Sequence, residues 1–273
     1  MMQQNMIETQ VITKEKTYKY DFSICTLVTK NSEYLEMMHS FIAKGFTKDN
    51  SEFLKIDNTQ GCTFDAYQGL NRFLQEAQGK YVILCHQDII LHDHDIQYLH
   101  QLIDEIDVKD KNWAILSNAG GINLKWIATH ITQGNGRIIT EKYLPLKVKT
   151  VDENFILVKN AANLSLSNNL SGFHFYGTDI CLIADVLGFT SYVIGFNLTH
   201  KSNGKIDDSF YKSLKNIKQK YKFAFRNRFI TTTFSRIYFS GTSILFLLNN
   251  SSLVLFLVRQ YYKFFTKKKD YSI

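Results

Sequence analysis

The apolar stretch Tyr81-Val-Ile-Leu-Cys85 runs directly into the polar residues His86-Gln87-Asp88. A short, uninterrupted apolar run of this kind is typical of a strand buried on both faces of a sheet. In open α/β sheets, ligands bind at the carboxyl ends of the strands, where side chains leave the sheet. The stretch therefore predicts a strand that delivers a histidine and a carboxylate to a ligand site. The alternative is that Asp88 only begins a turn.

Strand and helix patterns alternate on both sides of this stretch. Strand patterns at residues 22–29 and 52–56 alternate with helix patterns at 31–44 and 64–77. Further patterns indicate a helix at 99–106, a strand at 113–116, irregular β structure at 122–158, a short helix at 179–187, a strand at 191–195 and a charged helix at 207–225. This order predicts an α/β fold with a mixed, mostly parallel central sheet flanked by helices.

The composition fits one globular domain with a small appendage. The chain has 273 residues, of which 45% are hydrophobic and 21% charged, and it contains one proline. The four cysteines form no Cys-x-x-Cys pair, and residues 1–10 contain no apolar core of a signal peptide. These features predict reduced thiols in a cytoplasmic protein.

The net charge of +7 predicts an anionic partner. Much of the basic excess lies late, at residues 212–228 and 263–269. Nucleic acid, a membrane surface and phosphorylated substrates all fit this charge, but the aromatic residues form no RNA-binding signature. We therefore expect no nucleic-acid partner.

The end of the chain is apolar and then basic. Residues 242–258 carry no charge, Asn249-Asn250-Ser251-Ser252 interrupts them, and Arg259 and the run 267–269 follow. A membrane-spanning helix needs about 20 mostly apolar residues without such a polar centre. Two arrangements remain: helices that lie on an anionic membrane at the inner face of the cell membrane, or a hairpin packed on the protein or on a second subunit in a homo-oligomer.

Three predicted strand ends meet at one edge of the sheet. They are residues 26–29, Asp57-Asn58 and His86-Gln87-Asp88. A carboxylate at Asp57 could accept hydrogen bonds from a base or a ribose, and one at Asp88 could bind a divalent cation. Later along the chain, Asp179 begins a helix and His200 follows an apolar strand. Helix capping and a satisfied histidine are the alternatives there.

Several short motifs, in order, carry a resemblance to a known family. They are Ile56-Asp57-Asn58, Ala66-Tyr67, Glu76-Ala-Gln-Gly-Lys-Tyr81, Cys85-His-Gln-Asp-Ile89, Phe173-His-Phe-Tyr-Gly-Thr-Asp-Ile-Cys-Leu182, and Val193-Ile194 leading to His200. Residues 22–204 thereby resemble the glycosyltransferase family 2-like enzymes of GT-A fold. The subgroup most similar has His-Gln-Asp in place of Asp-x-Asp. The resemblance implies a GT-A domain at 21–205, between an N-terminal extension at 1–20 and a helical region at 206–273.

The resemblance also implies an activity. An enzyme of this family would move a sugar from a nucleotide sugar, with UDP or GDP as the nucleotide, to a saccharide or lipid-linked acceptor. Inversion at the sugar and a place in surface polysaccharide or glycan synthesis are implied with it. The alternative is a non-catalytic nucleotide-sugar-binding or assembly module, because His86 stands where most relatives of the wider family have the first acid.

Roles for particular residues follow from the same resemblance. Asp179 would be the catalytic base, and Asp88 and His200 would bind Mn²⁺ or Mg²⁺. The nucleotide-sugar site would comprise Thr26, Asp57, Asn58, His86, Gln87 and Asp88. At position 178, where the family commonly has Glu, this chain has Thr. The resemblance therefore does not assign the acceptor site.

Two acidic segments have competing interpretations. Asp152 and Glu153 are a second candidate pair for chemistry at an acceptor loop, or a solvated turn before a strand at 155–158. The segment His92-Asp93-His94-Asp95 could form part of a metal-dependent hydrolase site with His86 and Asp88. It precedes an apolar-periodic helix, however, so helix capping explains it better.

Overall fold

The computed structural model describes residues 9, 11–13, 16–202, 204 and 206–267. The chain forms two compact units, Met1–Leu214 and Lys215–Ile273. The division falls inside helix α5 (Asp208–Ala224). The domain boundaries predicted after residues 20 and 205 stay predictions, and much of the extension at 1–20 lies outside the described residues.

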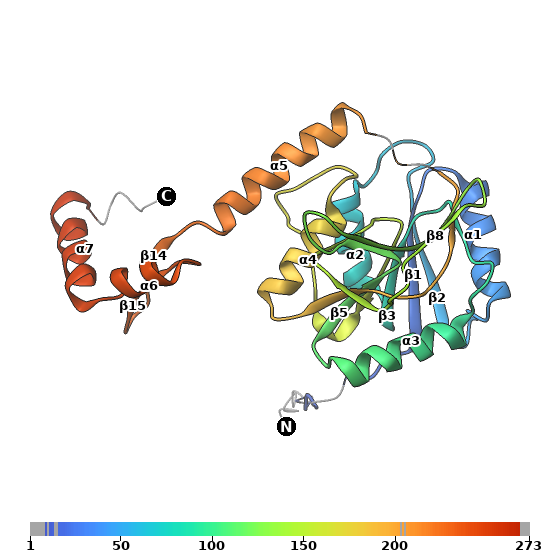
Figure 1. Cartoon of the computed structure of the whole chain (residues 1–273), viewed down its shortest axis with the longest axis horizontal. Coiled ribbons are helices and arrows are strands. Elements are labelled where there is room, and N and C mark those ends of the chain that lie inside the picture. The colour runs from blue at the N-terminus through green and yellow to red at the C-terminus, as the bar shows by residue number, and fades with distance from the viewer. Residues whose placement is uncertain (1–8, 10, 14–15, 203, 205, 268–273) are drawn as a thin grey trace, which may run out of the picture. The chain divides into compact units, whose positions relative to one another are not determined.

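A seven-stranded sheet forms the centre of the first unit (Figure 1). Its order is β2 (Ser51–Asp57), β1 (Tyr20–Val28), β3 (Gly79–Cys85), β11 (Phe155–Lys159), β5 (Trp113–Ser117), β12 (Thr190–Val193) and β9 (Leu146–Val148). The junctions β2–β1, β1–β3 and β5–β12 are parallel, whereas β3–β11, β11–β5 and β12–β9 are antiparallel. The predicted mixed α/β sheet is confirmed, but it is less parallel than predicted because β11 enters antiparallel between β3 and β5.

Helices flank the sheet. They are α1 (Asn31–Ala43), α2 (Ala66–Glu76), α3 (Ile96–Lys109) and α4 (Tyr176–Val186). Apolar residues of α1 and α3, such as Met37 and Leu99, share one buried cluster with Phe22 of β1 and Trp113 of β5. Burying large apolar and aromatic side chains in this way is the main source of stability for such a layer.

A second sheet brings the later part of the chain to the end of β3. Its strands are β10 (Thr150–Val151), β6 (Ala119–Gly121), β7 (Ile127–Gln133), β13 (Thr199–His200) and β4 (Ile89–Ile90), with β8 (Ile138–Thr140) beside β7. The antiparallel pairing of β13 with β4 sets His200 opposite Ile89. Residues 86–90 therefore lie against residues 199–202, although they are far apart in the sequence.

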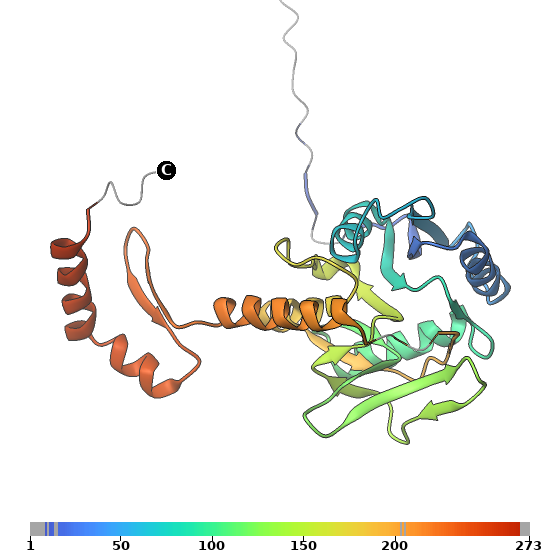
Figure 2. The same cartoon turned by 90° about the horizontal axis from the view of Figure 1, so that it is seen from above.

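The second unit contains the hairpin of β14 (Arg228–Thr231) and β15 (Arg236–Phe239), and the helices α6 (Ser243–Asn249) and α7 (Ser252–Phe265) (Figure 2). The interruption predicted at residues 249–252 separates the two helices. Among the described residues, no single helix has the length and apolarity to cross a membrane, whereas α6 and α7 together meet that test with a 68° bend between them. Of the basic run at 267–269, Lys267 is described and the other two residues lie outside the described part.

Candidate metal and ligand site

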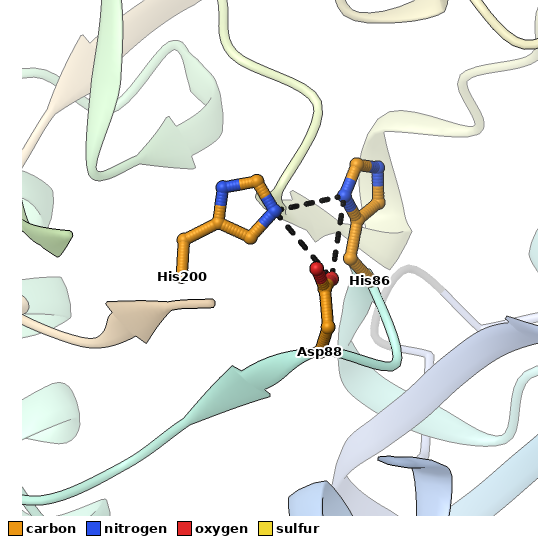
Figure 3. Close-up of side chains that lie close together, drawn as sticks. All are labelled: His86, Asp88 and His200. Carbon is orange, nitrogen blue, oxygen red and sulfur yellow. Dashed lines mark hydrogen bonds and ion pairs between the residues drawn. The ribbon is translucent and has the colours of Figure 1, made fainter. Parts of the chain in front are cut away.

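Two histidines and an aspartate converge at the carboxyl end of β3 (Figure 3). His200 Nε2 lies 3.5 Å from Asp88 Oδ1, and His86 Nδ1 lies 3.9 Å from the same oxygen. The two ring nitrogens are 3.4 Å apart. The sequence predicted that Asp88 and His200 act together, and the structure brings both against His86.

Two of the three separations suit a divalent cation, and the third, 3.9 Å between His86 Nδ1 and Asp88 Oδ1, is slightly longer. Ligand atoms that share one ion, each about 2.0–2.2 Å from it, lie roughly 3–3.5 Å from one another. Carboxylate oxygen is a common ligand for Mg²⁺ and Mn²⁺, whereas imidazole nitrogen is more typical of transition metals. The donor set of two imidazoles and one carboxylate therefore fits Mn²⁺ better than Mg²⁺.

The electrostatics of the group favour the metal-binding protonation states. Burial opposes ionisation of Asp88, but hydrogen bonds from His200 and Ser202 outweigh it and hold the pKa of the Asp88 carboxyl well below its usual range. Burial and the neighbouring His200 lower the pKa of His86. At neutral pH the site thus presents an ionised carboxylate and a neutral His86 ring, the forms that bind metal.

Tyr176 fixes the tautomer of His86. The Tyr176 hydroxyl donates a hydrogen bond to the backbone carbonyl of Glu153 at 3.1 Å, and it lies 2.8 Å from His86 Nε2. A carbonyl only accepts, so the single hydroxyl proton is used there and His86 Nε2 carries the proton shared with the tyrosine. The unprotonated Nδ1 then faces Asp88 and His200, as a metal ligand requires.

A cavity of ≈ 510 Å³ lies beside this group. Its polar lining comprises Thr29, Lys30, Glu33, His86, Gln87, Asp88, Glu153, Lys201 and Ser202, and its apolar lining includes Leu27, Ala66, Leu70, Leu84, Phe173 and Tyr176. A largely apolar pocket with a few convergent polar groups is typical of a small-molecule site. The two lysines supply positive charge next to the carboxylates.

Gln87 joins the end of β3 to the start of α1. Its Oε1 accepts hydrogen bonds from the backbone amides of Thr29 and Lys30 at 2.8 and 2.9 Å. Its Nε2 donates to Thr29 Oγ1 at 2.9 Å. Gln87 therefore shapes the cavity wall, and its predicted contact with a nucleotide sugar stays a prediction.

The predicted nucleotide-binding residues Thr26, Asp57 and Asn58 lie in three different environments. The β1–β2 register pairs Val28 with Asp57, so the exposed Asp57 carboxylate lies on the same sheet edge as the cavity. Asn58 is buried and holds its own loop, donating to the carbonyl of Phe64 at 2.9 Å. Thr26 is fully buried, 3.4 Å from Cys85 Sγ, because its side chain points into the sheet layer rather than toward its edge.

Asp179 lies in α4 and makes hydrogen bonds that support the fold. Its side chain is fully buried, and its two oxygens accept from the amide and hydroxyl of Ser167 at 2.7 and 2.8 Å. Of the residues that the structure describes, it is not among those lining the cavity. The carboxylate thus anchors the preceding loop to α4, and its predicted catalytic role stays a prediction.

The segment 92–95 caps a helix. Asp95 precedes α3 and accepts from the backbone amide of Tyr98 at 2.8 Å, which confirms the capping interpretation. His94 Nδ1 accepts from the amide of Asn197 at 2.8 Å. Within the described part of the chain, the candidate metal group consists of His86, Asp88 and His200, without His92 or His94.

Comparisons with solved structures show what the fold is similar to. GalNAc-T7, solved with UDP, GalNAc and Mn²⁺, aligns with a TM-score of 0.52 and 11% identity over 75% of this chain. The alignment covers 48% of GalNAc-T7, so this chain spans about half its length. The mixed α/β fold is therefore similar to the GT-A glycosyltransferase fold. The A197 protein from STIV aligns with a TM-score of 0.38 and 10% identity over 68% of this chain and 97% of its own.

Comparison with individual protein sequences identifies a relative. No protein-family model matches the chain. A protein of Fuscovulum blasticum named "ATP synthase subunits region ORF 6" is 31% identical over 226 residues, which are 81% of this chain and 91% of that protein. That name states no reaction. The chain belongs to the same family as this Fuscovulum blasticum protein.

Proposed function

We propose that the protein is a metal-dependent, inverting glycosyltransferase of the His-Gln-Asp subgroup. It moves a sugar from a UDP- or GDP-sugar to a saccharide or lipid-linked acceptor in surface polysaccharide or glycan synthesis. The observation that carries the proposal is the convergence of His86, Asp88 and His200 beside a cavity on a GT-A-like fold. The solved neighbour contains UDP, GalNAc and Mn²⁺, which supports the same classes of ligand here.

The residues around the cavity fit the parts of such a donor. His86, Asp88 and His200 would hold Mn²⁺ or Mg²⁺, which stabilises the negative charge on a departing diphosphate. Lys30 and Lys201 line the same cavity and would add positive charge near the diphosphate oxygens. The exposed Asp57 carboxylate, at the end of β2, would accept hydrogen bonds from the nucleoside.

The alternative is a non-catalytic binding module. It rested on the missing first acid of Asp-x-Asp, at the position of His86. The His86 ring nitrogen lies 3.4 Å from His200 Nε2, so both could bind one ion, and histidine would then replace that acid as a ligand. Tight nucleotide binding without transfer would still favour the binding module.

We propose in addition that the second unit holds the protein at the inner, cytoplasmic face of the membrane. Large apolar side chains on α6 and α7 are exposed, including Ile244, Leu247, Leu253, Phe256 and Phe264. Arg259 and Lys263 lie on α7 among them. Exposed apolar residues beside cations are typical of helices that bind anionic lipid at its surface.

Nucleoside diphosphate release tests the activity. UDP-glucose, UDP-galactose, UDP-GalNAc and GDP-mannose are each incubated with the protein, an octyl glycoside acceptor and Mn²⁺ or Mg²⁺. We expect release with at least one donor, and a loss of about 10²-fold or more in Asp88→Ala because the leaving group is no longer stabilised. Turnover that is equal in Asp88→Ala would sink the proposal.

A further inference from the structure

A carboxyl group that the sequence left between two interpretations lies in the wall of the cavity. Glu153, between β10 and β11, is half-buried and lines the cavity that contains His86 and Asp88. Its Oε1 accepts from the backbone amide of Gly177 at 3.4 Å, in the first turn of α4. The amides of Phe175 and Tyr176 also act on this carboxyl group. Glu153 therefore meets the start of α4 from the loop between β10 and β11.

Gly177 makes this approach possible. A Cβ atom at Gly177 would lie 2.4 Å from the carbonyl oxygen of Val151 and 3.3 Å from Glu153 Cγ. The first of these distances is a steric clash with backbone, so any side chain at position 177 would push the segment that carries Glu153 away. The first turn of α4 thus has a glycine where it approaches the cavity, and the Glu153 carboxyl group lies against that glycine.

Glu153 also belongs to the network of the metal group. Its backbone carbonyl accepts from the Tyr176 hydroxyl, which contacts His86 Nε2. Burial raises the pKa of the Glu153 carboxyl to about 8, with the Asp152 carboxylate adding to the increase and the α4 amides opposing it. The charged and titratable groups around it are Asp152, Tyr176 and, through the tyrosine, His86. A carboxyl that titrates near neutral pH is suited to exchange protons during catalysis.

We propose that Glu153 is the general base that deprotonates the acceptor hydroxyl, in the role that the family resemblance implied for Asp179. This inference rests on the proposed glycosyl transfer. In the step, the acceptor oxygen forms a bond to the anomeric carbon, and the bond from that carbon to the diphosphate oxygen breaks. The electron pair leaves with the diphosphate, and the acceptor proton passes to the Glu153 carboxylate. One such displacement inverts the anomeric carbon.

A purely structural role for Glu153 would be to cap α4, and one substitution separates the two roles. Glu153→Gln keeps an oxygen that can accept from the α4 amides but cannot take up a proton. Glu105→Gln is the matched control, because Glu105 is an exposed side chain on α3. Thermal unfolding and calorimetry with UDP and Mn²⁺ establish that both variants fold and bind nucleotide as the wild type does.

Steady-state kinetics with the best donor and octyl glycoside then give the result. We expect Glu153→Gln to lower kcat by about 10²–10⁴-fold with little change in donor KM, and Glu105→Gln to match the wild type. We also expect kcat/KM of the wild type to fall about tenfold for each pH unit below the pKa of Glu153, and the variant to lack this dependence.

The possible failures are distinguishable. If the wild type transfers sugar and Glu153→Gln keeps both its kcat and its pH dependence, Glu153 only caps α4 and the glycosyltransferase assignment stands. If Asp179→Asn, once folded, loses kcat while Glu153→Gln does not, the base is Asp179. Absence of transfer by the wild type with every donor overturns the proposed function and this assignment together.

Discussion

The Tyr176 hydroxyl lies 2.8 Å from His86 Nε2, and this contact determines which nitrogen of His86 faces Asp88. The tyrosine comes from α4 and the histidine from the end of β3, so the contact also ties two elements of the fold at the site. Groups that orient a metal-binding histidine commonly affect metal affinity nearly as much as the ligands do.

Tyr176→Phe is expected to weaken Mn²⁺ binding by about 10–100-fold, because the His86 ring loses the partner that fixes its tautomer. Isothermal titration with Mn²⁺ measures the change. Tyr143→Phe, at an exposed tyrosine, is the control. Equal Mn²⁺ affinity in Tyr176→Phe and wild type would show that the contact does not position His86.

Metal affinity is expected to depend on pH through His86. Burial and His200 lower the pKa of His86, so this ring stays neutral at neutral pH, and the Asp88 carboxyl stays ionised well below that. Protons compete with the ion as the pH falls toward the lowered pKa of His86. Titrations with Mn²⁺ from pH 5 to pH 8 should show constant affinity above pH 7 and weaker binding at pH 5. Tighter binding at pH 5 than at pH 8 would contradict imidazole ligands.

Asp179→Asn is expected to destabilise the first unit by about 1–3 kcal/mol, because a neutral amide replaces a carboxylate that accepts two hydrogen bonds from Ser167, and hydrogen bonds to a charged acceptor are stronger. Urea denaturation gives the free energy of unfolding. Asp185→Asn, at an exposed position of the same helix, should change it little. An unchanged free energy in Asp179→Asn would mean that the carboxylate is not the anchor of the loop.

Glu153→Gln is expected to stabilise the protein at alkaline pH. The pKa of Glu153 is raised to about 8 in the folded protein, above about 4.3 in an unfolded chain, so the folded state binds more protons between these values. Stability that depends on the protonated carboxyl is therefore lost as the pH rises through that window. Thermal unfolding should give equal Tm values for the two proteins at pH 4 and a higher Tm for Glu153→Gln at pH 9. The higher Tm corresponds to a gain of about 1 kcal/mol or more in the free energy of unfolding. A lower Tm of the variant at pH 9 would contradict the raised pKa.

The second unit is expected to bind anionic membranes in the full-length protein. Co-sedimentation with vesicles containing phosphatidylglycerol should exceed that with phosphatidylcholine alone and decrease with salt. Replacing Arg259 and Lys263 of α7 with glutamate should reduce it, because each cation near such a surface contributes about 1 kcal/mol. Failure to sediment with either vesicle, together with a dimer in gel filtration, would favour the packed hairpin between two subunits.

Local sequence patterns predicted most elements of the first unit. The strand predicted at 22–29 is Tyr20–Val28, the helix at 31–44 is Asn31–Ala43, and the strand at 81–85 is Gly79–Cys85. Periodicity and capping residues are local, so they can be found in one sequence. The direction of β11 depends on partners far along the chain, which local patterns do not encode. For the same reason, more strand pairs of the central sheet were predicted to be parallel than the three that are observed.

The candidate site was predicted in part. Asp88 and His200 were paired by the resemblance and lie 3.5 Å apart, but the contribution of His86 depends on the ring orientation that Tyr176 imposes. Thr26 was expected at the sheet edge, yet alternation along β1 turns its side chain into the buried layer. The role of Glu153 was left between two interpretations, because its environment is formed by α4. The close approach of α4 to Glu153 depends on Gly177. That glycine, three residues after His174 and two before Asp179, was the signal in the sequence.

In the proposed function, the group of His86, Asp88 and His200 makes sugar transfer depend on a divalent cation. The most direct measurement is the rate of nucleoside diphosphate release by protein treated with EDTA, dialysed, and titrated with Mn²⁺ or Mg²⁺. We expect no significant release without metal, saturable recovery with Mn²⁺ and weaker recovery with Mg²⁺, and no recovery in His200→Ala at the same Mn²⁺ concentrations. Full release from the metal-free protein, or equal recovery in His200→Ala, would contradict it.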